Sequence, residues 1–462
     1  MMPSLTTTAL LAQETVENIS AQAQLQYFLS VVLTPSGIGL ALAGATALAI
    51  VLITRKGFPI LVAAALLCLT TMLQDVSLTK NVLIGPLQSL RNVARPVALG
   101  LLLAACLTVL QAPVGNRLRV VGFTASSFFA FQLLFLSEML IGNPTKAILA
   151  FLSIPCMFFV CTIGFGRRMQ DRESTRSILE VFAWVTMGFI AANMAQLVID
   201  RSNALVGLRL AGIAGNAQQM GGVCVMLMLF NVYLFNDLPA KRPLKWICAV
   251  MIGILGLWII WTGSRTSVLT AMVGLVFTYR LRIGRLALLG LAAGTVLLVA
   301  MSFFVESTDT VERLTSGTNT RAAVWQVSLS EFMGSPIFGT MPLGYESGSE
   351  SSYISALANM GLIGILALMV PFGSMALGAL RALRLRAMRP DLGAQCDFYV
   401  GMVAALLVIN AFEAFAFGVL TLPVMIMYSV FALDGFLAEH EALASAGYGL
   451  PASVDDAEYS YQ

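Results

Sequence analysis

Long apolar stretches alternate with short polar connections along this chain from about residue 37 to residue 437. Each stretch is close to the ~20 residues that an α-helix needs to cross the hydrocarbon core of a bilayer. The stretches are continuous, as in residues 286–299, and lack the alternation of polar and apolar positions that transmembrane β-strands show. The pattern therefore predicts an all-α fold, a polytopic transmembrane helical bundle.

We predict about 12 or 13 spans. The final pair can be drawn in two ways, because Gly418 and Pro423 suit either a tight hairpin or a break within one long helix. The spans lie near residues 37–53, 58–74, 96–112, 120–141, 147–166, 178–199, 219–236, 245–261, 264–279, 286–305, 354–378, 397–415 and 419–437.

Composition agrees with a membrane protein. Of 462 residues, 58% are apolar and only 11% are charged, whereas soluble domains carry roughly 25% charged residues. Alternate loops divide the cations unevenly, with 18 of the 27 Lys and Arg residues on one side. The positive-inside rule places that side in the cytoplasm and the N-terminus outside.

This topology predicts five regions. They are a periplasmic N-terminal segment (1–36), ten transmembrane helices (37–305), a long periplasmic loop (306–353), further transmembrane helices (354–437) and a polar C-terminal tail (438–462). The tail contains His440, which is the only histidine of the chain. Histidine-rich zinc sites and a Ser-His-Asp triad inside the bundle are therefore excluded. The chain has seven cysteines and no CxxC pair, so we expect no disulfide framework. We also expect no nucleic-acid partner.

The long outward loop is the first candidate for chemistry, because loops of this length are usually functional. It holds a partly amphipathic stretch at residues 320–332, a Gly-Ser-Pro turn at 334–336 and a Gly- and Ser-rich stretch at 344–353. Glu350 comes just before an apolar helix. It could cap that helix, where the favourable interaction of its charge with the helix dipole is about 0.3 to 1 kcal/mol, or it could be a catalytic residue.

Two further outward segments contain unexpected arginines. Residues 261–267 interrupt two spans and place Arg265 at the outer membrane boundary, where it suggests an anionic partner, a snorkelling side chain or a salt bridge. Residues 207–220 form a glycine-rich loop with Arg209 and Asn216, and a helix beginning near Gln218 would point its N-terminus at an anion. Together the three segments suit a lipid-linked phosphate substrate with its head group in the periplasm.

The motifs in these segments, in this order, resemble the O-antigen ligase and O-antigen polymerase superfamily over about residues 200 to 370. The N-terminal half agrees only in being hydrophobic. The residues that carry the resemblance are Arg209 with its Gly-Asn loop, Gly263-Ser-Arg-Thr266, Arg321-Ala-Ala-Val-Trp325, Ser335-Pro-Ile-Phe-Gly339, Glu350-Ser-Ser-Tyr-Ile354 and Gly361-Leu-Ile-Gly364.

The resemblance implies a multi-pass enzyme of the bacterial inner membrane with its active site facing the periplasm. Such enzymes transfer a glycan from undecaprenyl pyrophosphate to an acceptor glycan without a metal or another cofactor. Ligases use lipid A core as the acceptor and carry a His-Asn-x-Tyr-like element where this chain has Glu350-Ser-Ser-Tyr353. We therefore expect a polymerase of O-antigen, capsule or exopolysaccharide repeats, with a chain-length regulator as a candidate partner and a ligase as the alternative.

In this interpretation Arg265 and Arg209 hold the pyrophosphate, assisted by Arg321, because guanidinium groups bind phosphate oxygens bidentately. Glu350 is the candidate catalytic base of an inverting transfer, and Glu346 is the second choice. Further candidate substrate-binding residues are Asn216, Ser264, Trp325 and Tyr353.

Weaker candidates and another protein class also remain. Glu138 and Glu413 could line an acceptor groove or be hydrogen-bonded structural residues. A transporter or flippase would also have twelve or more spans. It would be expected to concentrate polar residues at the midplane and to show repeats.

Overall fold

The computed structural model describes residues 57–71, 85–111, 122–142, 144–281, 322–341 and 350–446. The chain divides into two compact units, Met1–Ile60 and Leu61–Gln462, and the packing described below belongs to the second. The predicted N-terminal segment, the spans near 37–53 and 286–305, and most of the C-terminal tail lie outside the described residues. Arg321 and Glu346 also lie outside them.

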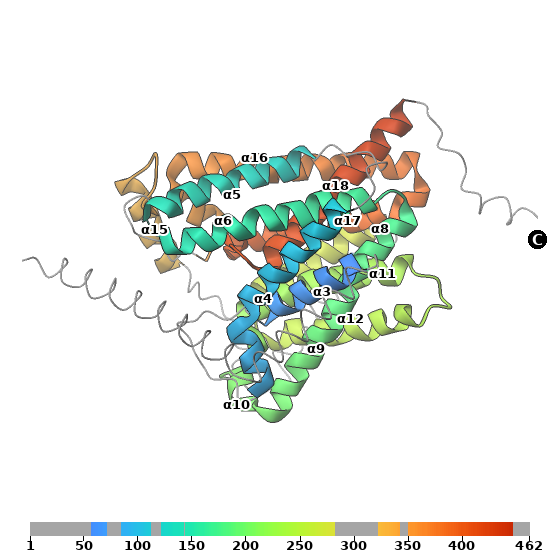
Figure 1. The fold of residues 1–462 in the computed structure, drawn as a ribbon, viewed down its shortest axis with the longest axis horizontal. Coiled ribbons are helices and arrows are strands. Elements are labelled where there is room, and N and C mark those ends of the chain that lie inside the picture. Colours follow the sequence, from blue (N-terminus) through green and yellow to red (C-terminus); the bar gives the residue numbers. More distant parts are fainter. Residues whose placement is uncertain are drawn as a thin grey trace, which may run out of the picture. The chain divides into compact units, whose positions relative to one another are not determined.

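The described residues are almost entirely helical (Figure 1). Short elements interrupt the helices: the π-helical turn η2 (Phe159–Gly164), the antiparallel strands β1 (Leu205–Val206) and β2 (Arg209–Leu210), and the 3-10 turns η3 (Gly212–Ala214), η5 (Pro390–Leu392) and η6 (Phe415–Phe417). The helices are α3 (Gly57–Thr70), α4 (Gly85–Leu110), α5 (Phe123–Gly142), α6 (Pro144–Phe158), α7 (Phe165–Arg168), α8 (Arg172–Leu179), α9 (Val181–Ile199), α10 (Arg201–Ala204), α11 (Ala217–Asp237), α12 (Pro243–Trp261), α15 (Ala322–Gly334), α16 (Ser352–Met388), α17 (Gly393–Phe412) and α18 (Leu422–Ser445). A further helix occupies residues 265–281.

Within the described part of the chain, eight helices are long and apolar enough to cross a membrane, which confirms the predicted polytopic all-α fold. Two shorter apolar helices, Gly57–Thr70 and Ala94–Leu110, accompany them. The eight candidate spans are Phe123–Ile141, Ala150–Arg168, Arg172–Ile199, Ala217–Asp237, Pro243–Trp261, Ser352–Met388, Pro390–Phe412 and Leu422–Ser445.

The last two spans are separate helices. α17 ends at Phe412, and α18 begins at Leu422 with Pro423 in its first turn, where a proline needs no helical donor. α18 continues to Ser445, beyond the predicted end of the span at residue 437. His440, which we assigned to the tail, is therefore a buried residue of this helix, with its Nδ1 atom 2.9 Å from the carbonyl oxygen of Phe436.

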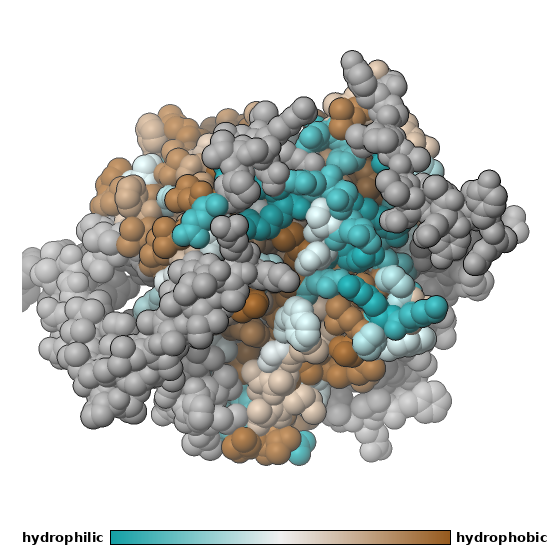
Figure 2. All heavy atoms as spheres, turned by 45° about the vertical axis from the view of Figure 1, so that its right-hand side comes forward, coloured by the Kyte–Doolittle hydropathy of each residue, from teal (hydrophilic) through white to brown (hydrophobic). Residues whose placement is uncertain are grey.

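The bundle has a buried central helix and an apolar outer surface. Most residues of helix α11 are buried, and it packs against α9, α12 and α17, as expected for a helix that is apolar on all sides. By contrast, most residues of α12 are not buried, and it exposes Val250 and Leu257. Figure 2 shows apolar surface over much of the face in view, interrupted by a band of hydrophilic side chains. An apolar exterior of this kind suits a surrounding lipid bilayer.

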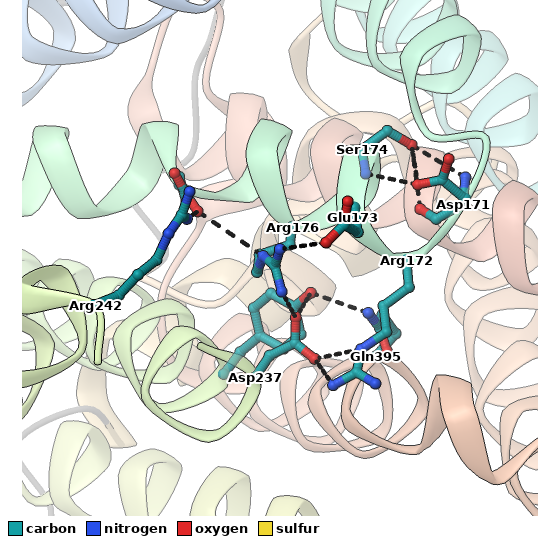
Figure 3. A network of polar contacts seen from close by, with 10 residues as sticks. Asp171, Arg172, Glu173, Ser174, Arg176, Asp237, Arg242 and Gln395 are labelled. Atoms are coloured by element: carbon teal, nitrogen blue, oxygen red, sulfur yellow. Dashed lines mark hydrogen bonds and ion pairs between the residues drawn. The ribbon is translucent and has the colours of Figure 1, made fainter. Parts of the chain in front are cut away.

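Arginines from the predicted cytoplasmic loops pair with buried acids at one end of the bundle, which we call the inner end. Asp237 at the end of α11 lies 2.7 Å from Arg172 and 3.8 Å from Arg176 of α8 (Figure 3). Asp171 caps α8 through the backbone N–H of Ser174. The buried carboxylate of Asp237 is thus neutralised by two guanidinium groups, which offsets the cost of removing it from water.

Two other buried aspartates also pair with arginines of the predicted cytoplasmic side. Asp397 of α17 lies 2.9 Å from Arg280 and 2.8 Å from Arg386. Asp434 of α18 lies 3.4 Å from Arg381 and accepts a hydrogen bond from Thr124 at 2.7 Å. The predicted cytoplasmic arginines therefore also join neighbouring helices.

Candidate functional site

Arg209 lies on the β1–β2 hairpin, which reverses at Gly207 with a φ of +65°. Its Nε atom donates a 2.7 Å hydrogen bond to the carbonyl oxygen of Thr262. The indole N–H of Trp261 donates to the carbonyl oxygen of Leu208 at 3.0 Å. These two bonds fix the hairpin on the turn that follows α12, at the end of the bundle opposite the inner end, which we call the outer end.

Arg265 begins the helix at 265–281, directly after the turn that Arg209 contacts. Gly263 has a φ of +60° there, and the buried hydroxyl of Ser264 accepts from the backbone N–H of Ser267 at 3.3 Å. Ser264 is therefore the N-cap of this helix. The side chain of Arg265 is exposed. Because Arg209 bonds to the turn before this helix, the two predicted phosphate-binding arginines lie on adjoining segments.

Helix α11 begins at Ala217, one residue before the predicted start near Gln218, and Asn216 is its N-cap. The side-chain oxygen of Asn216 accepts from the backbone N–H of Gln218 at 2.8 Å. One turn later, a Cβ atom on Gly221 would overlap the hydroxyl of Ser267, and one on Gly222 would come within 2.9 Å of Phe415. The start of α11 therefore packs between the helix of Arg265 and the α17–α18 connection.

Glu350 precedes α16 and is partly buried, but it does not cap that helix. The N-cap is Ser351, whose hydroxyl accepts from the backbone N–H of Ile354 at 3.4 Å. The helix-capping role that the sequence suggested for Glu350 therefore belongs to Ser351.

Ser352 connects the start of α16, which we call the Glu350 corner (residues 350–352), to the α17–α18 connection. Its fully buried hydroxyl lies 2.7 Å from Oδ1 of Asn410 and 3.0 Å from the carbonyl oxygen of Glu413. The same oxygen accepts from the backbone N–H of Ala416 at 3.2 Å. Because Ala416 adjoins Phe415, which packs on Gly222, the Glu350 corner and the two arginines share one end of the bundle.

Tyr353 and Trp325 take packing positions. The hydroxyl of Tyr353 donates to the carbonyl oxygen of Leu407 at 3.3 Å, and its ring meets Phe372 edge-on. The ring of Trp325 on α15 lies 6.5 Å from that of Phe412.

Two polar atoms on the same helix have no hydrogen-bond partner among the residues that the structure describes. They are the buried indole nitrogen of Trp325 and Oε2 of Glu331, which are six residues apart and lie on the inward stripe of α15 together with Ser328. A donor and an acceptor with no protein partner are open to the hydroxyl groups of a ligand.

Helix α16 is broken at Gly361, where φ is +64°. The turn after α15 fills the break: Leu362 donates its backbone N–H to Pro336 at 2.9 Å, and Thr340 donates to Ala358 at 3.0 Å. The break leaves a short helix, residues 352–360, next to Glu350. Two motifs of the resemblance, residues 335–339 and 361–364, are thus in direct contact.

The sequence interpretation missed the central position of Ser352 and underrated the Asn410–Glu413 segment. An asparagine, Asn410, within an apolar span was the available sequence signal, since a polar side chain there needs a partner, and the structure shows it fully buried. Glu138, by contrast, is buried near the end of α5 and is not part of these contacts. No group of metal-ligating side chains gathers in the described ranges.

Comparison of the chain with protein-family models and with curated protein sequences gives no match.

Proposed function

We propose that this protein is a membrane glycosyltransferase that polymerises cell-surface polysaccharide repeats at the periplasmic face of the bacterial inner membrane. The donor is a glycan on undecaprenyl pyrophosphate, and the acceptor is the sugar of another lipid-linked repeat. The observation that carries the proposal is the 2.7 Å bond from Arg209 to Thr262. It fixes Arg209 on the turn that leads into the helix of Arg265, at the end of the bundle that also contains Glu350.

The arginines act on the leaving group. The Nε atom of Arg209 donates to Thr262, and in this proposal its terminal nitrogens bind the phosphate. Arg265 is exposed at a helix N-terminus, where the helix dipole adds to its charge. Two guanidinium groups stabilise the negative charge that develops on the pyrophosphate as it departs. Arg321 is a third candidate for this role.

Glu350 acts on the nucleophile. An acceptor hydroxyl attacks the anomeric carbon of the donor sugar, and a new carbon–oxygen bond forms. The bond from that carbon to the pyrophosphate oxygen breaks, and its electron pair leaves with undecaprenyl pyrophosphate. The hydroxyl proton passes to the carboxylate of Glu350, and attack from the opposite face inverts the configuration.

The test is polymer synthesis in proteoliposomes that contain the lipid-linked repeat. Arg265→Lys keeps the charge but loses the bidentate fork, so we expect the turnover rate to fall about 100-fold. Glu350→Gln should have a similar effect. The matched control is Arg384→Lys, an exposed arginine near the opposite end of α16 that should leave turnover unchanged.

Full activity of Arg265→Lys, or of both Glu350→Gln and Glu346→Gln, would contradict the assigned roles. Activity only when lipid A core is supplied would identify a ligase. A requirement for a chain-length regulator would show as a change in polymer length on its addition.

A transporter is the second candidate, because Asp434, a buried acid within the candidate span Leu422–Ser445, pairs with Arg381 and Thr124. Gradient-dependent flux of the lipid-linked repeat without any new glycosidic bond would support it and would contradict the enzyme.

A further inference from the structure

Helix α15 and the turn after it expose apolar side chains. Leu329 and Met333 on the helix are 43% and 76% exposed, and Ile337 and Phe338 in the turn are 54% and 59% exposed. The inward stripe of the same helix contains Ser328 and Glu331. Trp325 and Phe332 also lie on the less exposed side, so apolar side chains occupy both faces of α15, whereas a helix that packs on a protein in water keeps its apolar side chains inward.

The apolar turn is fixed to a membrane span. Leu362 and Ile363 donate their backbone N–H groups to the carbonyl oxygens of Pro336 and Ile337, at 2.9 and 3.4 Å. Leu362 and Ile363 are themselves 48% and 38% exposed, and they begin the long apolar part of α16. The exposed side chains of the turn therefore continue the lipid-facing surface of that span.

The depth of this contact follows from helix geometry. α16 runs on from Leu362 to Arg381, where its cluster of arginines begins, and at 1.5 Å per residue this distance is about 28 Å. The hydrocarbon core of a bilayer is ~30 Å thick. With Arg381 at the inner boundary, Leu362 lies at the outer boundary, and the turn bonded to it lies at the same level.

We infer that the segment from α15 to residue 341 is embedded in the outer leaflet rather than surrounded by water. Leu329, Met333 and Phe338 contact phospholipid acyl chains, and Gln326 and Ser330 lie at the level of the head groups. The sequence predicted a periplasmic loop at residues 306–353, and the inference places the described part of it, residues 322–341, in the membrane. It holds whether or not the protein transfers glycans.

The surface that this segment presents favours lipid over a protein partner. The apolar patch is continuous with the exposed Leu362 and Leu366 of a span, so any occupant must also cover lipid-facing helix. No ionisable side chain lies on the exposed face of α15 in residues 324–334, so a charged protein surface would find no complement there.

The test is nitroxide accessibility in proteoliposomes of phosphatidylethanolamine and phosphatidylglycerol. Cysteine is introduced by Met333→Cys or Phe338→Cys and spin-labelled, and the signal of the equally treated unaltered protein is subtracted, because the chain has native cysteines. Leu366→Cys is the lipid-exposed control and Glu173→Cys the aqueous control. Both wild-type residues are exposed.

We expect oxygen to relax the labels at 333 and 338 as strongly as the label at 366, and a water-soluble nickel chelate to have at least tenfold less effect than at 173. Labels from Gln326→Cys or Ser330→Cys should give intermediate values. Strong relaxation by nickel at 333 and 338 would show that the segment lies in water and would overturn the inference.

Two further results decide the outcome. Protection from both reagents at 333 and 338 would show a protein cover, such as a second copy, and would also overturn it. Because a labelled variant could misfold, each must elute as the unaltered protein does in size-exclusion chromatography. Bimane fluorescence quenched by lipids with a shallow nitroxide provides an independent measurement, and absence of quenching at both positions would contradict the inference.

Discussion

The backbone N–H of Thr340 donates to the carbonyl oxygen of Ala358 across 3.0 Å, at the break in α16. A break inside a membrane span frees backbone groups that lipid cannot satisfy. Here the turn after α15 satisfies them on both sides of the break, before Gly361 and after it. The short helix that follows Glu350 is therefore held at both of its ends, by Ser352 and by this turn.

The first prediction concerns the close approach of the two segments. Gly361→Ala should lower the stability of the protein by about 2 kcal/mol or more. An alanine resists a φ of +64°, and its Cβ atom would overlap the carbonyl oxygen of Ile337. Gly373→Ala on the same helix is the control, because no atom lies within 4 Å of its added Cβ. Thermal unfolding in detergent would measure both, and equal midpoints would contradict the contact.

The sequence supplied the two motifs but not their contact. Residues 335–339 could be recognised as a turn from Ser-Pro and Gly, and residues 361–364 as part of an apolar helix. The two motifs are joined by hydrogen bonds between backbone atoms, and the identity of the side chains does not reveal such bonds. The positive φ of Gly361 depends on that pairing, so the predicted uninterrupted span at 354–378 could not reveal the break.

The second prediction concerns the inner end. Asp237→Asn should destabilise the protein by about 3 to 5 kcal/mol, because it removes the buried charge that the partly buried Arg176 and the half-exposed Arg172 both face. Glu173→Gln is a matched control, since Glu173 also pairs with Arg176 but is 80% exposed. Pairs at such exposed positions add little to stability.

Chemical unfolding followed by tryptophan fluorescence would measure this difference. An Asp237→Asn variant as stable as Glu173→Gln would show that the buried pair is not needed. The positive-inside rule predicted on which side of the membrane these arginines lie. It could not predict their partners, because pairing depends on which helix ends become neighbours.

The third prediction tests a sugar-binding role for the inward stripe of α15, and it depends on the proposed function. Glu331→Gln should raise the KM for the lipid-linked repeat about tenfold with little change in kcat, because a carboxylate accepts stronger hydrogen bonds from sugar hydroxyls than an amide. Trp325→Phe keeps an aromatic ring and loses the indole N–H, so a smaller rise is expected. Gln326→Ala, on the exposed face, is the control. Unchanged KM values for both variants would exclude the role.

The fourth prediction separates the positioning of Glu350 from substrate binding. Ser352→Ala removes the hydroxyl that lies 2.7 Å from Oδ1 of Asn410 and accepts from the backbone N–H of Ala416 at 3.2 Å, and it leaves these two buried atoms without this partner. The cost in stability is about 1 to 3 kcal/mol. Because Glu350 is two residues away, we also expect kcat to fall about tenfold while KM changes little.

Ser429→Ala is the matched control for this change. Its hydroxyl is equally buried, donates to the carbonyl oxygen of Met425 and bonds to the thiol of Cys161, and neither partner adjoins Glu350, so its loss should leave kcat unaltered. Steady-state kinetics in proteoliposomes at a temperature where both variants are folded would separate the two effects. A fall in kcat for both variants would assign the loss to general destabilisation. Loss in Ser352→Ala alone would support a specific link from the α17–α18 connection through Ser352 to Glu350.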